Sequence, residues 1–251
     1  MRVAMLALPL MLVAAGPNPP RSSAPKNGQE LIRAMHDRYA GQWYKTLSFT
    51  QNNTATDTAG KETHSVWKEY ANIPGNLRID FLPADSGQGY IFRADSLYIF
   101  RHDSVRRAAP FIHPLMVLGF DVYASPAETT IAKLTRLGFD LSKIHEDMWD
   151  GHPAYVVGVD AGDNHHKQFW VDKDRLLFVR IVEPGQQDST ILQDTRFEDY
   201  RAIGKVWLSA RVRFLINGKP NWLEEYIDIR TGDPLTNVLW DPKQFAAARP
   251  K

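Results

Sequence analysis

The chain has 251 residues, no cysteine and a formal net charge of +1, from 30 basic and 29 acidic side chains. Such a balance argues against nucleic acid or another polyanion as a partner, because those partners need a clustered basic surface. The absence of cysteine excludes disulfides, thiolate metal sites and cysteine nucleophiles.

The first 15 residues are typical of a secretory signal peptide. One basic residue, Arg2, precedes an apolar run that ends in the small residues Ala14-Ala15. The run is shorter than the roughly 20 apolar residues that cross a membrane. We therefore expect cleavage near Ala15, export to the periplasm, and a flexible Pro/Ser linker over residues 16–27.

A single domain is expected over 28–251, beginning with one helix and continuing with strands. Asn27 and Glu30 have the spacing of a capping box, and apolar residues then recur on one helical face from Leu31 to Tyr39, which predicts a helix over 28–40. Short, aromatic-rich alternating runs with tight polar turns then predict antiparallel hairpins. These runs occupy 47–51, 62–71, 77–81, 89–93, 97–102, 143–149, 154–160, 167–172, 176–183, 189–198, 205–216 and 221–229.

Residues 110–138 interrupt this rhythm and are expected to be helical. The first part is strongly apolar and does not alternate, and Ser125-Pro126-Ala127-Glu128 has the spacing of a capping box. One interpretation is a buried core helix. The other is an apolar lid over a cavity in the sheet, which Pro114 and Gly119 favour because they break the segment into short pieces.

No constellation of catalytic or metal-binding residues stands out. His165 and His166 follow a polar turn and are interpreted as part of it, and Ser86 lacks the setting of a nucleophile elbow. The paired carboxylates are interpreted as solvated strand edges; they are Glu146, Asp147, Glu198, Asp199, Glu224 and Glu225. We expect no metal, no cofactor and no enzymatic activity.

An ordered set of short motifs resembles the LolA/LolB-like periplasmic carriers, the outer-membrane lipoprotein-sorting proteins. The element order matches over about 28–245. The motifs are Trp43-x-x-x-Leu47-x-Phe49-Thr50-Gln51, Val66-Trp67-Lys68, Pro74-x-x-Leu77-Arg78-Ile79, and Phe169-Trp170-Val171-Asp172 with Leu177-x-x-Arg180.

The resemblance implies an unclosed, highly curved antiparallel half-barrel of about eleven strands, mainly β, with helices in its concave face as a lid. It also implies a monomeric carrier that shelters acyl chains of lipoproteins or lipids in a hydrophobic cavity. The implied partners are an inner-membrane donor and an outer-membrane acceptor. Family members tether the lid through an arginine on the second strand, and the candidates here are Lys68 and Arg78.

The expected ligand-binding residues lie on the lid and on the facing strands. They are Phe111, Ile112, Leu115, Met116, Leu118 and Phe120 on the lid, opposite Phe49, Trp67 and Phe81. Two alternative functions stay open on the same fold: a regulatory module that senses envelope lipid or lipoprotein, and an enzyme acting on a lipophilic substrate.

Overall fold

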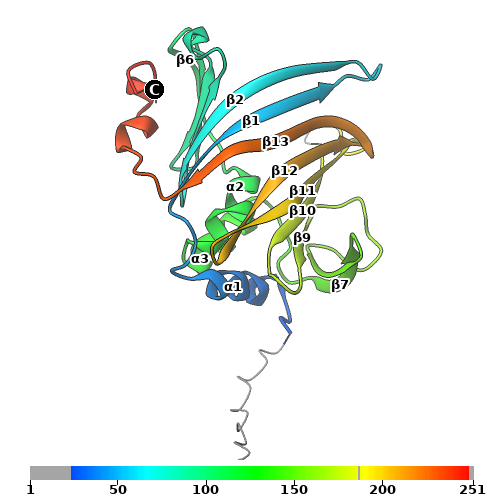
Figure 1. Cartoon of the computed structure of the whole chain (residues 1–251). Coiled ribbons are helices and arrows are strands. Elements are labelled where there is room, and N and C mark those ends of the chain that lie inside the picture. The colour runs from blue at the N-terminus through cyan, green and yellow to red at the C-terminus, as the bar shows by residue number, and fades with distance from the viewer. Residues whose placement is uncertain (1–23, 186, 249–251) are drawn as a thin grey trace, which may run out of the picture.

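One antiparallel sheet of 13 strands is the main element of the computed structural model, which describes residues 24–185 and 187–248 (Figure 1). In chain order the strands are β1 (Thr46–Thr56), β2 (Glu62–Asn72), β3 (Asn76–Phe81), β4 (Gly89–Arg93), β5 (Ser96–Arg101), β6 (Ser104–Pro110), β7 (Ile144–Trp149), β8 (His152–Val157), β9 (Gln168–Asp172), β10 (Phe178–Pro184), β11 (Leu192–Ile203), β12 (Val206–Ile216) and β13 (Lys219–Thr231).

The sheet consists of two meanders that join in its middle. Its strand order is β6-β5-β4-β3-β2-β1-β13-β12-β11-β10-β9-β8-β7, so β1 and β13 connect the halves. Figure 1 shows the sheet curling round the helices, and within the described residues its edge strands, β6 and β7, do not pair with each other. The predicted fold, an unclosed half-barrel, is confirmed, with 13 strands in place of about eleven.

The hairpins form as their sequences predict, and one was not foreseen. Ala94 and Asp95 both adopt positive φ between β4 and β5 (50° and 54°), the conformation that tight hairpin turns require. His102 and Asp103 do the same between β5 and β6 (50° and 59°). Strand β6 was missed because its sequence, SVRRAAP, is exposed almost throughout and shows no apolar alternation.

The first helix, α1 (Gly28–Tyr39), confirms the prediction over 28–40. The Asn27 side chain caps it by accepting a hydrogen bond from the Glu30 amide at 2.8 Å. Its buried residues include Leu31, Ile32, Met35 and Tyr39, the predicted apolar face.

The helical interruption is also present, in three short pieces. They are α2 (Pro114–Gly119), the 3-10 turn η2 (Asp121–Tyr123) and α3 (Ala127–Arg136). The capping box predicted at Ser125 is wrong, because Pro126 occupies the N-cap position of α3 and no side chain caps that helix. Figure 1 shows α2 and α3 within the curl of the sheet, and α1 across its lower end.

The largest hydrophobic core consists of residues from the helices and from the inner face of both meanders. A smaller apolar cluster lies on the outer face, where the C-terminal turns η3 (Asn237–Trp240) and η4 (Pro242–Gln244) return to the sheet. There the Phe245 ring stacks on Phe100 with centroids 3.9 Å apart.

The remaining predictions on chain organisation stay predictions. The signal peptide and most of the 16–27 linker fall on residues 1–23, which lie outside the described residues. No described helix combines the length and the apolar character needed to span a membrane.

Candidate functional site

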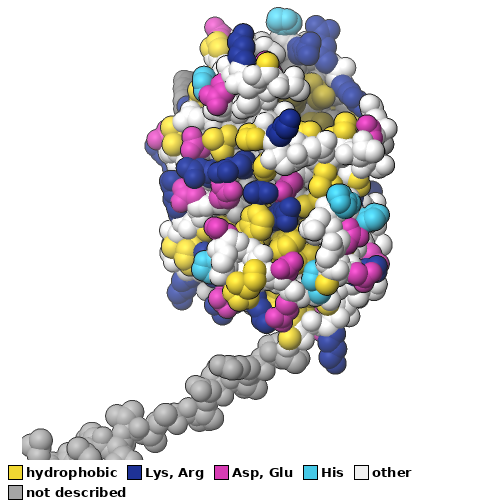
Figure 2. Space-filling view, turned by 90° about the vertical axis from the view of Figure 1, so that its right-hand side faces the viewer, with side chains coloured by type: hydrophobic (Ala, Val, Ile, Leu, Met, Phe, Trp, Pro, Cys, Tyr) yellow, Lys and Arg dark blue, Asp and Glu magenta, His cyan; other side chains and the backbone are white. Residues whose placement is uncertain are grey.

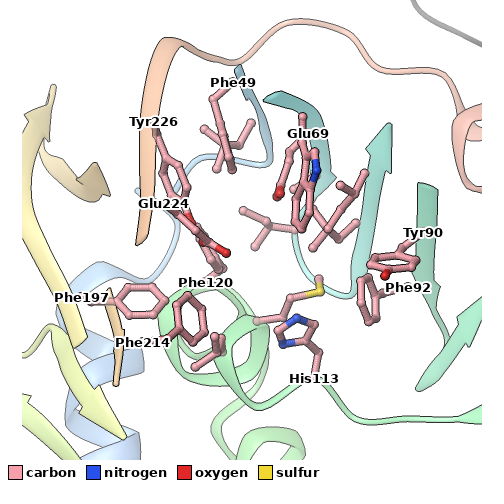
Figure 3. A pocket seen from close by; sticks show the side chains of 18 residues that line it. Phe49, Glu69, Tyr90, Phe92, His113, Phe120, Phe197, Phe214, Glu224 and Tyr226 are labelled. Atoms are coloured by element: carbon pink, nitrogen blue, oxygen red, sulfur yellow. The ribbon is translucent and has the colours of Figure 1, made fainter. Parts of the chain in front are cut away.

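A cavity of about 210 Å³ lies between α2 and the inner face of the sheet (Figure 3). Its wall is formed mainly by aromatic and aliphatic side chains from both meanders and from α2. The lining residues are Leu47, Phe49, Trp67, Glu69, Ala71, Ile73, Leu77, Ile79, Tyr90, Phe92, His113, Leu115, Met116, Phe120, Phe197, Phe214, Glu224 and Tyr226. Such a concave, apolar enclosure is the usual form of a site for a lipophilic ligand.

The alternation of side chains along each strand explains how aromatic residues come to line the cavity. In β1, Leu47 and Phe49 point inward because successive side chains of a strand alternate between the two faces of the sheet. Phe49 stacks on Tyr226 of the neighbouring β13 at 4.1 Å between centroids, and Trp67 of β2 stacks on Phe81 of β3 at 4.5 Å. Neighbouring strands therefore supply one continuous aromatic surface.

The structure brings five of the nine predicted ligand-binding residues to this cavity: Phe49, Trp67, Leu115, Met116 and Phe120. Figure 3 shows Phe49 on the strands above the cavity and Phe120 below it. Whether these side chains bind a ligand stays a prediction.

The other four predicted residues occupy different positions. The Phe81 ring stacks on Trp67 and also packs edge-on against Tyr90. Phe111 is 40% exposed, Ile112 lines a small neighbouring hollow, and Leu118 is fully buried in the core.

Residues of the C-terminal meander were missed by the sequence reasoning. Phe197, Phe214 and Tyr226 come from three adjacent strands, β11, β12 and β13, and complete the cavity wall. Their alternation was visible in the sequence, but their pairing with the N-terminal half through β1 and β13 was not.

Two acidic side chains, Glu69 and Glu224, also line the cavity. The interpretation of Glu224 as a solvated edge residue is wrong. Burial raises its pKa to about 7, while hydrogen bonds from Tyr226, Trp222 and Gln51 act in the opposite direction. Burial likewise raises the pKa of Glu69 well above its usual range, and the charge of Glu224 adds to that shift.

The opposite side of the cavity contributes a neutral group. Burial lowers the pKa of His113 to about 4, so its imidazole is uncharged at neutral pH. No lysine or arginine occurs among the residues that line the cavity. The acidic pair therefore has no basic partner within this wall.

Replacing Glu224 by glutamine should change how stability depends on pH. A carboxyl whose pKa rises on folding, here to about 7, loses stability as pH increases from about 4.5 to 7, because the folded state binds the extra proton. The variant should match the wild type near pH 4.5 and exceed it above pH 7, by about 3 kcal/mol at most. Urea unfolding across this pH range measures the difference.

Glu225→Gln is the matched control for this prediction. Glu225 is exposed on the outer face of β13, where it pairs with Arg211 at 3.2 Å. That variant should follow the wild-type pH profile, and an identical profile for Glu224→Gln would contradict the buried-acid assignment.

The helical elements that follow α2 are fastened to the sheet by residues not foreseen as tethers. Asp121 accepts a hydrogen bond from the Gly75 amide at 3.0 Å, between β2 and β3. Asp95, in the β4–β5 turn, forms ion pairs with Lys133 at 2.6 Å and Arg136 at 3.5 Å on α3. The fastening of the lid is thus polar and lies at the ends of the hairpins.

Both predicted tethers face away from the lid in this structure. Lys68 is exposed and alternates with the inward-facing Trp67 and Glu69. Arg78 alternates with cavity-lining residues of β3 and is fully buried on the outer side. Its Nη2 donates to the Phe245 carbonyl at 2.8 Å, so it holds the C-terminal segment and not the lid.

The paired histidines lie in a polar turn. Asp163 accepts hydrogen bonds from the amides of His165 and His166 at 2.9 and 3.1 Å and contacts the His166 Nδ1 atom at 2.7 Å. Over residues 24–185 and 187–248, no cluster of three or more histidine or acidic side chains could hold a metal ion.

The fold is similar to several solved structures at low sequence identity. A DUF1329 family protein from Desulfovibrio piger is 15% identical, with a TM-score of 0.58 over 88% of this chain and 98% of that one. An outer membrane lipoprotein-sorting protein domain from Vibrio parahaemolyticus is 14% identical, with a TM-score of 0.56 over 85% and 96%. A LolA superfamily protein from Nitrosomonas europaea is 15% identical, with a TM-score of 0.51 over 86% and 97%.

These similarities establish the fold. The resemblance inferred from the motifs is confirmed at that level, because the matches cover most of this chain and nearly all of each neighbour. No protein-family profile matches the sequence, and neither does any of the curated proteins with which it was compared.

Proposed function

We propose that this protein is a periplasmic carrier that shelters acyl chains of lipoproteins or lipids during their transport to the outer membrane. The observation that carries the proposal is the apolar cavity enclosed between α2 and the curved sheet. Burying each CH₂ group is worth about 0.8 kcal/mol, so an acyl chain gains much by leaving water for this wall. The shared fold with a lipoprotein-sorting domain and a LolA superfamily protein supports the same function.

The size of the cavity indicates that α2 moves when a chain binds. Its volume of about 210 Å³ is below the roughly 300–1,000 Å³ of pockets that enclose a drug-sized ligand. The fastening of the neighbouring helix α3 is compatible with such a movement. Its ion pairs with Asp95 are partly exposed, and pairs of this kind contribute about 0–1 kcal/mol each. In this proposal α2 is a lid, and the structure represents its closed position.

The proposal includes export and binding without catalysis. The leader over residues 1–15 supports export with cleavage near Ala15. A monomer that takes its cargo from an inner-membrane donor and gives it to an outer-membrane acceptor would suit a cavity covered by a lid. The sensor and enzyme alternatives would use the same cavity.

Native mass spectrometry of protein from the periplasm of its own host tests these points together. We expect a chain that starts near Gly16 and carries an acyl-containing species, which is released at higher collision energy and can be identified by extraction. A chain that starts at Met1 would contradict export with cleavage. A chain without bound lipid that also fails to take up a fluorescent acyl probe would contradict the carrier function.

The same preparation separates the alternatives. Conversion of the bound species into a product would favour the enzyme. A protein partner that binds only the lipid-loaded chain, with no transfer of lipid to membranes, would favour the sensor.

A further inference from the structure

Polar groups gather at one side of the apolar cavity, where β2, β1 and β13 run side by side. Asn53 of β1 lies opposite Glu224 of β13, and Gln51 lies between Trp67 of β2 and Tyr226 of β13. Gln51 and Asn53 are only 1% and 2% exposed. The cavity wall therefore presents two carboxyls, Glu69 and Glu224, and the two buried amides lie next to this wall on the adjacent strand β1.

Several hydrogen-bonding positions in this cluster are unfilled. Gln51 Nε2 donates to Asn53 Oδ1 at 2.6 Å, while Gln51 Oε1 and Asn53 Nδ2 have no partner among the described residues. Buried polar atoms without partners destabilise a fold, because they lose their hydrogen bonds to water and gain none in return. A cluster that lowers stability in this way, next to a cavity, indicates a function in binding.

Glu224 already has donors on both oxygens. Tyr226 donates to its Oε2 atom at 2.8 Å and Trp222 Nε1 to its Oε1 atom at 3.2 Å. The carboxyl is thus held in a fixed orientation, and Figure 3 shows it pointing into the cavity. Three groups here can still accept hydrogen bonds: the remaining lone pairs of Glu224, the Glu69 carboxyl and Gln51 Oε1.

A ligand group that complements these acceptors has several hydrogen-bond donors and a positive charge. The facing side of the cavity supplies His113, which is neutral, together with Tyr90 and the apolar residues of α2, β11 and β12. A primary ammonium has three donors and a charge opposite to that of a carboxylate. Hydrogen bonds between such charged groups are about twice as strong as neutral ones.

We infer that Glu69 and Glu224 on the cavity wall, together with the adjacent Gln51, bind the primary ammonium head of a long-chain amphiphile. Its alkyl chain then extends toward Leu115, Met116 and Phe120. This inference rests on the proposed lipid-carrying function and names the class of ligand for the same cavity.

Competition between three ligands of equal chain length tests the inference. Dodecylamine, dodecanol and dodecanoate, each below its micelle concentration at pH 7, displace a neutral pyrene-labelled acyl probe. We expect dodecylamine to bind at least about tenfold more tightly than dodecanol, as one charged hydrogen bond provides. Dodecanoate should bind most weakly, because its carboxylate finds no opposite charge among the lining residues, which include neither lysine nor arginine.

Two variants and one control locate the effect. Glu224→Gln and Glu69→Gln keep the shape of the side chain, and each should reduce the preference for dodecylamine about tenfold while dodecanol binds as before. Glu225→Gln removes an equal charge from the outer face and should change nothing. Melting curves of all three variants establish that each is folded.

The outcomes separate this inference from the function on which it rests. If the probe and dodecanol bind but the three head groups compete equally, the ammonium site is wrong and the carrier proposal stands. Unchanged selectivity in both cavity variants has the same meaning. If the probe and all three ligands fail to bind, the carrier proposal itself is wrong.

Discussion

Replacing Leu115 by aspartate should abolish most acyl-probe binding while lowering the melting temperature by only a few degrees. Leu115 lines the cavity from α2 and is half-buried, so the unliganded protein can hydrate the new carboxylate from the cavity side. A bound chain would strip that water away. Burying an unpaired charge costs several kcal/mol, and about 3 kcal/mol corresponds to roughly 100-fold in affinity. Met116→Asp should act in the same direction with a larger loss of stability, because Met116 is 6% exposed.

Two neighbours on the same segment provide matched controls. Leu118 is fully buried in the core, so Leu118→Asp should unfold the protein or lower its melting temperature far more than Leu115→Asp. Phe111 is 40% exposed, so Phe111→Asp should leave binding and stability nearly unchanged. Fluorescence titration and thermal melting of the three variants give the comparison. If Leu115→Asp collapses the fold, or leaves binding intact, α2 is ordinary core and the lid proposal fails.

The hairpins could be predicted because their signal is local. Alternation of apolar and polar residues sets which face of a strand is buried, and short polar turns return the chain beside itself. Strand β6 lacked that signal since six of its seven side chains are exposed at the edge of the sheet. Its charged residues, Arg106 and Arg107, are typical of edge strands that avoid pairing with other chains.

The site was only partly predictable because its position depends on pairings distant in sequence. The lid segment stood out through its composition, and Leu115, Met116 and Phe120 do reach the cavity. Residues of the second meander reach it only because β13 pairs with β1, more than 150 residues away in the chain.

Glu224 shows that an acidic residue in the sequence need not be exposed to solvent in the fold. The sequence does indicate which face of the strand Glu224 occupies. Trp222, Glu224 and Tyr226 are at alternate positions and therefore share one face of β13. The two aromatic neighbours indicated an inner face. Their hydrogen bonds to the carboxyl explain how an acidic group is accommodated there.

Removing either partner of the Arg78–Asp80 pair should destabilise the protein more than most substitutions. Arg78 is fully buried and Asp80 is 4% exposed; Nε and Nη2 of the arginine each donate to the carboxylate at 2.9 Å. Arg78→Met would leave that carboxylate buried without its cation, which typically costs about 3–5 kcal/mol. For a chain of this size the melting temperature should fall by roughly 10 °C.

The same pair connects the sheet to the C-terminal segment, so the variant also tests whether 28–251 unfolds as one unit. The Arg78 guanidinium lies 4.4 Å from the centroid of the Phe245 ring and donates to the Phe245 carbonyl. A Cβ at Gly89 would lie 2.9 Å from that ring, so glycine there lets the segment pack closely. We therefore expect loss of Arg78 to release the segment and lower the single unfolding transition of the whole chain.

The double variant Arg78→Met/Asp80→Leu identifies the cause of the loss. It removes both charges and leaves apolar side chains, and replacing a buried ion pair in this way is often close to neutral. We expect it to recover most of the stability that Arg78→Met loses, as measured by urea unfolding. If the double variant is as unstable as the single one, the unpaired carboxylate is not the cause, and the contacts of Arg78 with Phe245 hold the outer face together. A separate early transition in either variant would show that the C-terminal segment unfolds independently of the half-barrel.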